Sequence, residues 1–502
     1  MLSLAGARAG ARGRFSPPRP SRTPGSSRSR VASIPARATA TAPPDRAAST
    51  SGSLLASRRD PSPDHATHRD NVLSQLPEGK LVYVPAGTAQ TRNGVEGNAR
   101  FRQEPDFLYL TGIAEPGYHA LFGTGLGAPF VLVAPRQPTD MDVWCGPAPT
   151  PEELRARTGA DIVYYEDEWD KALHAVEARE GQTVFVPSHA RGAPPDDPEG
   201  VWANLRVEST ALSNVTARCR AIKSEQEIDC LRLANEVSAA AHVEMWRHAA
   251  RNGGDVYEFE LEAVFAAATM RRGLRHLGYP SIVGAGRNAA TLHYERNDAR
   301  CRAHDLVLVD AGAEFKGYTA DITRTFPAGG AFEPRRRDVY EAVLHVQNEA
   351  IASMRAGQHW RVIGERAKVS TVQALIDLGL VRGRAEDAAF AGVASVFMPH
   401  SLGHLLGLQV HDVGPHGPVP EMLESGQVVT VEPGIYFVEG LIKPAYEDPR
   451  TREFLVMDEI EKFEEVGGVR IEDNVAVYKD RVENLTETCP KTVEEIEEIM
   501  RE

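Results

Sequence analysis

The chain has few cysteines and no long apolar run, and these two gaps exclude whole classes of protein. Its 502 residues include five cysteines, an odd number, and no two of them have CxxC spacing. This pattern indicates free thiols in a reducing compartment and not a disulfide framework or a cysteine zinc site. No run of 18 apolar residues occurs, so we expect no membrane-spanning helix. The cysteines are Cys145, Cys219, Cys230, Cys301 and Cys489.

Positive charge is also scarce, except at the beginning of the chain. The formal net charge is −14, whereas a nucleic-acid binder needs a basic surface that displaces counterions from phosphates. Residues 1–59 hold eleven arginines, no lysine and a single acid, Asp45, which leaves a formal charge of −24 on the remainder. We therefore expect neither a nucleic acid nor a membrane as a partner.

Residues 1–64 have the composition of a targeting leader. They are rich in Arg, Ser, Ala and Pro and contain no acid before Asp45, as in mitochondrial and chloroplast transit peptides. The alternative is a disordered tail without function, since so little apolar material cannot offset the entropy of ordering. We expect import into the mitochondrion or chloroplast, with a cytoplasmic location as the alternative.

Two further segments follow, residues 65–215 and residues 216–502. The first alternates short apolar runs such as LVYVPA and PFVLVAP with turns rich in Gly and Pro, which indicates mixed strands and helices. Within it, the aromatic segment FRQEPDFLYLTGIAEPGY is expected to form a packed strand and turn. The chain as a whole is therefore expected to belong to the α/β (α+β) class.

Capping boxes mark the first and last helices expected in residues 216–502. Ser224 and Glu227 form one such box before a long helical pattern, and Thr492 and Glu495 form another near the end of the chain. Apolar residues recur at helical spacing after each box, so both helices should pack against a sheet or core. These apolar residues are Ile228, Leu231, Ala234, Ala241 and Met245, and then Val493, Ile496 and Ile499.

Two aspartates interrupt the hairpin sequence VDAGAEFKGYTADITRTF. A tight turn at Lys316 and Gly317 places Asp310 and Asp321 on one face of adjacent strands, with Cβ atoms about 7 Å apart. Gly312 is expected opposite Asp321, which leaves open space between the two carboxylates. Like charges that converge in this way require a proton or a cation between them. A metal site is one explanation, and the other is that one aspartate caps a turn while the other is solvated.

Three later segments add histidines and glutamates in apolar surroundings. A lone strand glutamate is usually exposed, and a histidine pair at i, i+4 is often an incidental helix face. However, Glu432 and Glu472 are expected on almost continuously apolar strands, where an unpaired carboxylate would be costly. Two Asp, two Glu and a His suit a pair of divalent ions of the Mn, Co or Zn type. The segments are FMPHSLGHLLGLQVHDVG with His400, His404 and His411, VVTVEPGIYF with Glu432, and VGGVRIEDNVAV with Glu472.

Together these segments resemble the proline-specific metallopeptidases of the pita-bread fold, the prolidases and aminopeptidases P. The resemblance covers nearly all of residues 70–500, and it implies an aminopeptidase-P-like N-terminal domain over 65–215 and a pita-bread catalytic domain over 216–502. The motifs that carry it are LVLVDAG, GYTADITRTFP, PHSLGHLLGLQVHDVG, TVEPGIYF and GGVRIEDNV. The ligands it implies for two divalent ions, most often manganese, are Asp310, Asp321, His404, Glu432 and Glu472.

The same resemblance implies roles for residues near the ligands. The segment TLHYERND matches the substrate-facing His293 of the family pattern, which contacts the peptide group at the cleaved bond. His411 matches a second such histidine, which steadies the tetrahedral oxyanion. Glu432 is implied as the proton acceptor that later serves the leaving nitrogen. His400 and Arg470 match positions behind the ligands.

The activity that the resemblance implies is hydrolysis of peptides with proline second, by a homodimer. The tertiary amide before proline lacks an N–H, which defeats most other peptidases. The alternatives are a strict Xaa-Pro dipeptidase and a non-catalytic binding protein that reuses the fold. Relatives of the latter kind have lost ligands, as has the metal-free creatinase type, whereas all five remain here. A methionine aminopeptidase would lack the domain over 65–215.

Substrate length is where the sequence departs from its resemblance to the prolidases. The residues after Glu432 look like those of eukaryotic prolidases, which cleave dipeptides and bind the free carboxylate with an inserted Arg. Here that insertion is missing, and no Arg or Lys occurs from His411 to Glu432. A carboxylate taken out of water unpaired is heavily penalised, although Lys443 or Arg450 could replace the missing cation. We therefore expect cleavage of both Xaa-Pro dipeptides and longer peptides.

The leader makes a prediction that does not depend on the fold. A fluorescent reporter fused behind residues 1–60 should enter mitochondria or plastids and lose the leader, because an arginine-rich, acid-poor segment is the form that import machineries accept. Microscopy and the size of the recovered reporter test both parts. Fluorescence confined to the cytosol would reject the assignment.

Overall fold

The structure is a computed structural model that describes residues 61–90, 100–125, 127–188, 201–413 and 421–502. The leader expected over 1–64 therefore lies outside the described residues up to residue 60. Within the described ranges, no helix is both long enough and apolar enough to cross a membrane. The five cysteines, which all lie within the described ranges, form no disulfide with one another.

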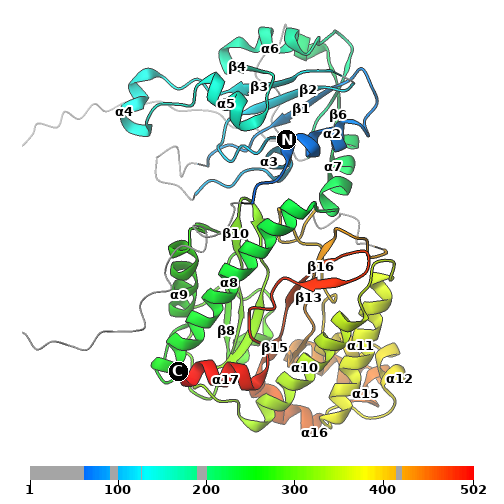
Figure 1. The fold of residues 1–502 in the computed structure, drawn as a ribbon. Helices are drawn as coiled ribbons and strands as arrows, with labels where there is room; N and C mark the ends of the chain where they lie inside the picture. Colours follow the sequence, from blue (N-terminus) through cyan, green and yellow to red (C-terminus); the bar gives the residue numbers. More distant parts are fainter. Residues whose placement is uncertain (1–60, 91–99, 126, 189–200, 414–420) are drawn as a thin grey trace, which may run out of the picture. The chain divides into compact units, whose positions relative to one another are not determined.

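The N-terminal domain is built on one mixed sheet of six strands, in the order β4-β3-β2-β1-β5-β6. Strands β1, β2 and β3 are antiparallel neighbours, and the outer pairings are parallel. Apolar side chains fill both faces of this sheet, and helices cover them (Figure 1). The elements are α2 His65–Leu73, β1 Leu81–Pro85, α3 Pro105–Thr111, β2 His119–Gly123, β3 Phe130–Ala134, α4 Asp142–Cys145, α5 Pro151–Thr158, β4 Ile162–Tyr165, α6 Trp169–Ala175, β5 Thr183–Phe185, β6 Arg206–Glu208 and α7 Ala211–Ala221.

The aromatic segment expected to be a strand is a helix, so that prediction was wrong. Helix α3 starts at Pro105, whose fixed φ suits the first helical position, and Glu104 accepts hydrogen bonds from the next two backbone amides. Gly112 ends it with a φ of 72°, the left-handed conformation common after a helix. These end signals outweigh the β-propensity of the aromatic residues. The expected domain boundary at residue 216 lies inside α7 and remains a prediction.

In the second domain, expected over residues 216–502, long helices surround short strands. Its strands form the sheets β12-β9-β8, β11-β10-β7, β13-β16-β17 and β14-β15. The elements are α8 Glu225–Arg251, α9 Glu258–Arg271, β7 His276–Leu277, β8 Ile282–Ala285, β9 Leu306–Asp310, β10 Ala313–Phe315, β11 Tyr318–Thr319, β12 Thr323–Pro327, α10 Pro334–Ser353, α11 Trp360–Asp377, α12 Ala385–Phe390, α13 Val393–Phe397, β13 Val428–Val431, β14 Gly434–Tyr436, α14 Glu439–Glu447, α15 Pro449–Arg452, α16 Met457–Ile460, β15 Gly468–Arg470, β16 Asp473–Val477, β17 Val482–Asn484 and α17 Val493–Arg501.

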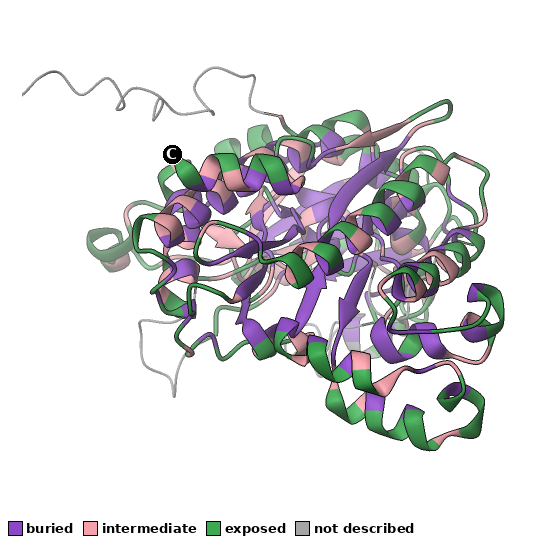
Figure 2. Cartoon of the chain, turned by 90° about the horizontal axis from the view of Figure 1, so that it is seen from below, coloured by how far each residue is buried: buried purple, intermediate pink, exposed green. Residues whose placement is uncertain are grey.

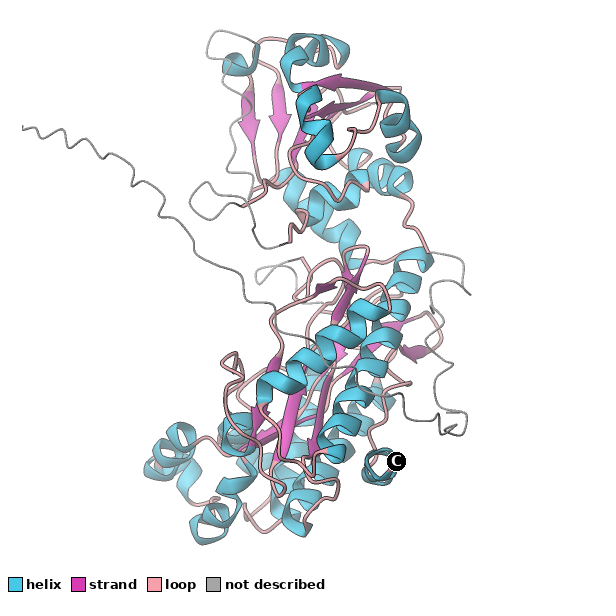
Figure 3. Ribbon diagram, turned by 90° about the vertical axis from the view of Figure 1, so that its left-hand side faces the viewer, coloured by secondary structure: helices cyan, strands magenta, loops and turns pink. Residues whose placement is uncertain are grey.

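Helices α8 and α17 begin where the sequence predicted. Ser224 with Glu227, and Thr492 with Glu495, form complete capping boxes, and the expected apolar residues of α8 are all buried. Ala234, Ala241 and Met245 join the main core around the strands of residues 216–502, whereas Ile228 and Leu231 join a cluster that also contains residues of the N-terminal domain. Figure 2 shows these strands almost wholly buried, whereas the surrounding helices keep an exposed outer side, and Figure 3 shows the helices flanking the strands from another direction. The residues of α8 that the sequence predicted to form its apolar face are thus the ones that are buried.

The aspartate hairpin has the predicted register but not the predicted space. Phe315 pairs with Tyr318, and Asp310 pairs with Thr323, as expected. The expectation of open space at Gly312 was wrong, because a Cβ there would lie 1.9 Å from the carbonyl oxygen of Ala320. The missing side chain of Gly312 therefore lets the backbone of the partner strand come close, and it does not create space between the two carboxylates.

The ladders of both strand pairs that carry candidate ligands are interrupted beside those ligands. Asp321, Glu432 and Glu472 lie in the interruptions, and Asp310 is the last residue of β9. Strand β13 ends at Val431, and β16 starts at Asp473, so Glu432 and Glu472 lie directly opposite each other between two short sheets. The expectation that they lie within strands was therefore wrong. Their amides bind elsewhere, that of Glu432 to the Leu402 carbonyl and that of Glu472 to the Thr323 carbonyl. This break leaves the carboxylates of Glu432 and Glu472 free to converge with the two aspartates of the other strand pair.

Candidate metal centre

One cavity of about 330 Å³ in the catalytic domain is lined by all nine residues singled out in the sequence. A larger groove, about 1110 Å³, lies between α10 and α11, but none of the nine lines it. Size alone therefore does not locate the chemistry. The nine residues are His293, Asp310, Asp321, His400, His404, His411, Glu432, Arg470 and Glu472.

The two aspartates converge on a tyrosine that the sequence reasoning missed. The hydroxyl of Tyr279 lies 2.6 Å from Oδ1 of Asp310 and 2.6 Å from Oδ1 of Asp321. Burial, together with these two carboxylates, raises the pKa of Tyr279 well above its usual value, so the phenol stays protonated. Nothing in the sequence distinguished this tyrosine, between a two-residue strand and Pro280, from an ordinary packed one.

His404 lies between carboxylates of the two hairpins. Its Nε2 is 3.4 Å from Asp321 Oδ2 and 3.4 Å from Glu432 Oε1, and its Nδ1 lies 3.0 Å from the Leu405 carbonyl. Asp321, His404 and Glu472 each offer one ligand atom, and these three atoms lie within 4.8 Å of one another. The segment from His400 to His404 is an extended loop and not a helix, so their i, i+4 spacing has no helical meaning.

The acids in this cavity resist being charged together. Burial raises the pKa of Asp321, and the charge of Asp310 raises it further. The pKa of Glu432 rises to about 7, mainly through burial, and that of Glu472 rises well above its usual range for the same reason and through neighbouring acids. Burial alone would lower the pKa of His404, but its hydrogen bond to Asp321 and the charge of Glu432 raise it to about 9. A protonated imidazole thus partly balances the acids.

Arg470 supplies the other positive charge. Its Nη2 donates to Asp310 Oδ2 at 2.6 Å, its Nη1 to the Tyr436 hydroxyl at 3.0 Å, and its Nε to Thr323 at 2.9 Å. His400 Nε2 lies 3.0 Å from the same tyrosine hydroxyl. Burial and the charge of Arg470 lower the pKa of His400 to about 4, so its 3.9 Å approach to Glu432 is not an ion pair. Arg470 thus contacts Asp310 directly and His400 lies beside Glu432, and the roles that the resemblance implies for these two residues remain predictions.

His293 and His411 are the more exposed histidines of the cavity. The ring of His411 lies edge-on to that of His404, with centroids 4.4 Å apart. Burial lowers the pKa of His411, as do His404 and His293. A neutral imidazole at this place can donate one N–H into the cavity.

The donor set fits divalent cations. Four carboxylates from two hairpins and one imidazole converge, and among the described residues lining the cavity only Arg470 carries a permanent positive charge. Carboxylate oxygens with an imidazole nitrogen suit Mn, Co or Zn. The raised pKa values of Asp321, Glu432 and Glu472 show how strongly the site needs added positive charge. Asp310, Asp321, His404, Glu432 and Glu472 would hold the ions.

Comparison with known proteins places this geometry in a family. The profile of metallopeptidase family M24 matches residues 229–479, and that of the aminopeptidase P N-terminal domain matches residues 65–185. The chain belongs to metallopeptidase family M24. The mixed α/β architecture, with an aminopeptidase-P-type domain before a pita-bread domain, is therefore confirmed.

Relatives of this M24 chain match along most of its length. A protein of the fungus Phaeosphaeria nodorum named as a probable Xaa-Pro aminopeptidase is 33% identical over 433 residues, which cover 84% of this chain and 91% of that one. The low-pH form of aminopeptidase P from Escherichia coli superposes with a TM-score of 0.75 at 29% identity, over 87% of this chain and 97% of that one. A zinc-substituted form of that enzyme in complex with product gives 0.74, with the same identity and coverage.

The charge balance of the cavity predicts that metal-free protein is less stable at high pH. The pKa of Glu432 is raised to about 7 and that of His404 to about 9, so the folded state holds these protons more tightly than the unfolded chain. Both contributions to the free energy of unfolding fall as pH rises, the first from about 4.5 to 7 and the second from about 6.5 to 9. These two groups should therefore lower the melting temperature of chelated wild-type protein, relative to that of Glu432→Gln, as the pH rises from 5.5 to 8.5. The comparison with the variant cancels the opposite contribution of histidines whose pKa is lowered, such as His400.

Calorimetry on chelated protein tests this, and Glu432→Gln is the matched control, since it removes one of the two titrations and should flatten the dependence. Adding Mn²⁺ at pH 8.5 should restore the lost stability by replacing the protons. A difference in melting temperature between the wild type and Glu432→Gln that stays level, or grows in favour of the wild type, between pH 5.5 and 8.5 would contradict this account of the site.

Proposed function

We propose that the chain is a metal-dependent Xaa-Pro aminopeptidase, which removes the first residue of a peptide whose second residue is proline. The observation that carries the proposal is the convergence of all nine candidate residues on one cavity. The names of the relatives and the family match over both domains support it. We further propose manganese as the native ion and a homodimer as the assembled form, both from the family resemblance.

A pair of divalent ions would lower the pKa of a water between them and polarise the scissile carbonyl. Glu432 accepts the proton of the attacking water on a carboxylate oxygen and delivers it to the leaving nitrogen of proline. His411 donates an N–H to the oxyanion that develops at the carbonyl. His293, on the same cavity wall, orients the peptide group at the cleaved bond. Arg470 and Tyr279 keep the aspartates aligned throughout, through the hydrogen bonds described above.

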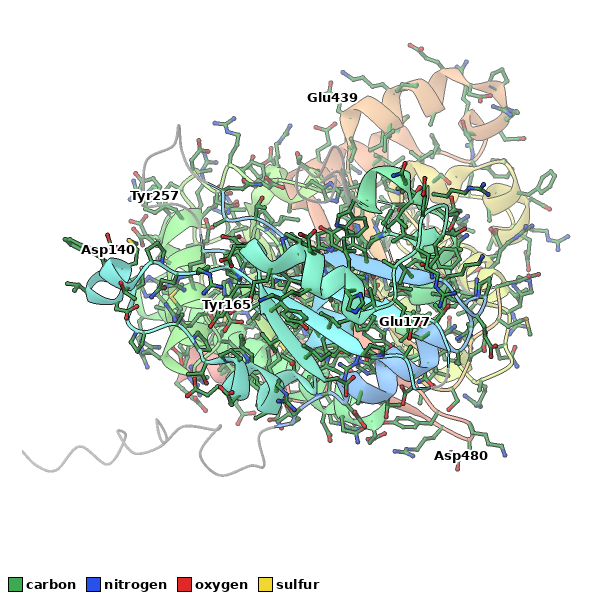
Figure 4. The ribbon with its side chains drawn as sticks, turned by 90° about the horizontal axis from the view of Figure 1, so that it is seen from above. Asp140, Tyr165, Glu177, Tyr257, Glu439 and Asp480 are labelled. Carbon is green, nitrogen blue, oxygen red and sulfur yellow. The ribbon has the colours of Figure 1, made fainter. Side chains whose placement is uncertain are left out.

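The described residues that line the cavity offer no free cation for a dipeptide carboxylate. Among the described residues that line it, Arg470 is the only Arg or Lys, and Asp310 and Tyr436 occupy it. Lys443 and Arg450 do not line the cavity and are mostly exposed. Each pairs with an acid on its own segment, Lys443 with Glu439, which lies at the periphery of the view in Figure 4. Residues 414–420, inside the stretch that lacks Arg and Lys, lie outside the described residues.

A panel of variants separates metal ligands from the oxyanion donor. Chelation should abolish activity, and Asp310→Asn and Glu432→Gln should lose both activity and bound metal, since too little negative charge remains to hold two cations. His411→Ala should keep its metal and lose turnover by about 10²-fold, because a lost oxyanion donor costs that much. Steady-state kinetics with elemental analysis of the same samples measures both.

His345→Ala, an exposed histidine on α10, is the control and should change neither quantity. Two metals and near-normal turnover in Asp310→Asn would contradict the dinuclear assignment. Equal metal loss from His411→Ala and His404→Ala would contradict the division of labour between the two histidines.

Because the described lining of the cavity has no free Arg or Lys, we expect the protein to hydrolyse Xaa-Pro peptides of different lengths. Both Gly-Pro and Gly-Pro-Ala should be hydrolysed, because no fixed cation rewards a carboxylate directly after proline. Release of glycine from the two peptides measures this, with Gly-Ala-Ala as the control that tests the need for proline. Lys443→Ala and Arg450→Ala should leave the ratio of the two rates unchanged. Cleavage of Gly-Pro with Gly-Pro-Ala left intact would identify a strict dipeptidase instead.

A further inference from the structure

A buried arginine joins the N-terminal domain to the loop that carries His411. Arg220, on α7, donates from Nη1 to Asp106 Oδ1 at 2.8 Å and from Nη2 to Asp412 Oδ1 at 2.7 Å. The same Nη2 lies 2.9 Å from the Gln409 side-chain oxygen. The Arg220 side chain is 6% exposed and that of Asp412 only 1%. One rigid guanidinium therefore spans two acids that are far apart in the sequence.

The second oxygen of Asp412 is held as firmly. Lys223 Nζ donates to Asp412 Oδ2 at 2.8 Å. Burial would raise the pKa of Asp412, but Lys223 and Arg220 lower it, so the carboxylate is ionised at neutral pH. The Gly407 side is closed, since a Cβ at Gly407 would lie 2.5 Å from Asp412 Oδ2. One cation thus holds each carboxylate oxygen of Asp412, Arg220 on Oδ1 and Lys223 on Oδ2.

Fixing Asp412 also fixes its neighbour His411. The Asp412 amide donates to the Leu405 carbonyl at 2.9 Å, which ties this loop to the residue after His404. Val413 has a φ of 58°, a conformation that a β-branched residue adopts only when its surroundings impose it. The side chain of His411 thus leaves a backbone that is anchored on one side and strained on the other. Small movements of Asp412 must be transmitted to the imidazole.

A second contact between the same two domains bypasses this loop. His68 Nε2, from α2, lies 3.3 Å from Glu227 Oε2 on α8, and both side chains are 3% exposed. Glu227 also accepts from Ser224 and from the Tyr318 hydroxyl, and none of these groups touches residues 409–413 through a described contact. The Asp106–Arg220–Asp412 contact and the His68–Glu227 contact therefore connect the same two domains. Only the first of them includes a residue next to His411.

We propose that the N-terminal domain positions the catalytic His411 through the chain Asp106, Arg220, Asp412. Asp106 lies on α3 of the N-terminal domain, and its carboxylate accepts a hydrogen bond from Arg220. It fixes one arm of the guanidinium fork, and the other arm then fixes Asp412 and the backbone of His411. Asp106 and Arg220 are positioning residues, since neither lines the cavity. This inference rests on the proposed function.

The test is Asp106→Asn, which keeps the shape of the side chain and removes the charge that aligns Arg220. We expect kcat for Gly-Pro-Ala to fall about tenfold, because a small misplacement of a catalytic group is costly, while KM and metal content stay within about twofold. Arg220→Lys, which keeps the charge but loses the fork, should act in the same direction. Assays well below each variant's melting temperature keep folding defects out of the comparison.

The decisive measurement is a double-mutant cycle. In the His411→Ala background, Asp106→Asn should cause no further loss of kcat, because the residue through which it acts is gone. His68→Gln is the matched control, since it weakens the other domain contact. It should lower the melting temperature and leave kcat unchanged within about twofold.

The proposal would be overturned if Asp106→Asn and Arg220→Lys kept a normal kcat. It would also be overturned if Asp106→Asn lowered kcat by the same factor in the wild-type and the His411→Ala backgrounds. An equal loss of kcat in His68→Gln would also overturn it, since any loosening of the domains would then suffice. Complete inactivity of the wild-type protein on every Xaa-Pro peptide would instead reject the proposed function. The two failures are therefore distinguishable.

Discussion

The mutual repulsion of four carboxylates in one cavity is the constraint on which the rest of the catalytic domain depends. Asp310, Asp321, Glu432 and Glu472 come from two hairpins and meet where little solvent can screen them. Protons reduce this repulsion. The Tyr279 hydroxyl lies within hydrogen-bond distance of both aspartates, the raised pKa of His404 keeps its imidazole protonated, and the raised pKa of Glu432 favours its neutral form. Divalent ions would replace all of these at once, which is why the site belongs to a metalloenzyme and not to a simple acid-base pair.

The backbone is arranged to make that convergence possible. In both strand pairs the ladder stops near the candidate ligands and resumes in the same register. Asp321, Glu432 and Glu472 lie in these gaps, whereas Asp310 is the last residue of β9 and pairs with Thr323. The amides that lose ladder partners are satisfied by other groups, for example the Asp321 amide by the Asn474 side chain at 2.9 Å. A buried amide without a partner would cost as much as a lost hydrogen bond. The breaks are therefore stable features of the fold.

Selectivity and rate then follow from what surrounds the acids. The one arginine lining the cavity among the described residues is already bound to Asp310, so these residues offer no free permanent cation to a substrate. His411, by contrast, stands next to Asp412, whose carboxylate is held by buried Arg220 and Lys223. Buried cations paired with acids thus occur both beside a candidate ligand and beside a candidate catalytic histidine.

The sequence by itself determined the helix starts, the hairpin register and the identity of the site residues, because each depends on local or motif-level chemistry. Capping boxes satisfy their own backbone amides, and the alternation of a strand places Asp310 and Asp321 on one face whatever surrounds them. The motifs of a known family then led to nine of the sixteen residues that line the cavity. The helix after Glu104 is also determined locally, by end signals to which the sequence reading gave too little weight. Only the tertiary structure decided what depends on distant neighbours. The backbone of Ala320 lies against Gly312, where open space was expected. Tyr279 acquired its place between two aspartates, and Asp106 its link to His411, from chain segments that no sequence spacing relates.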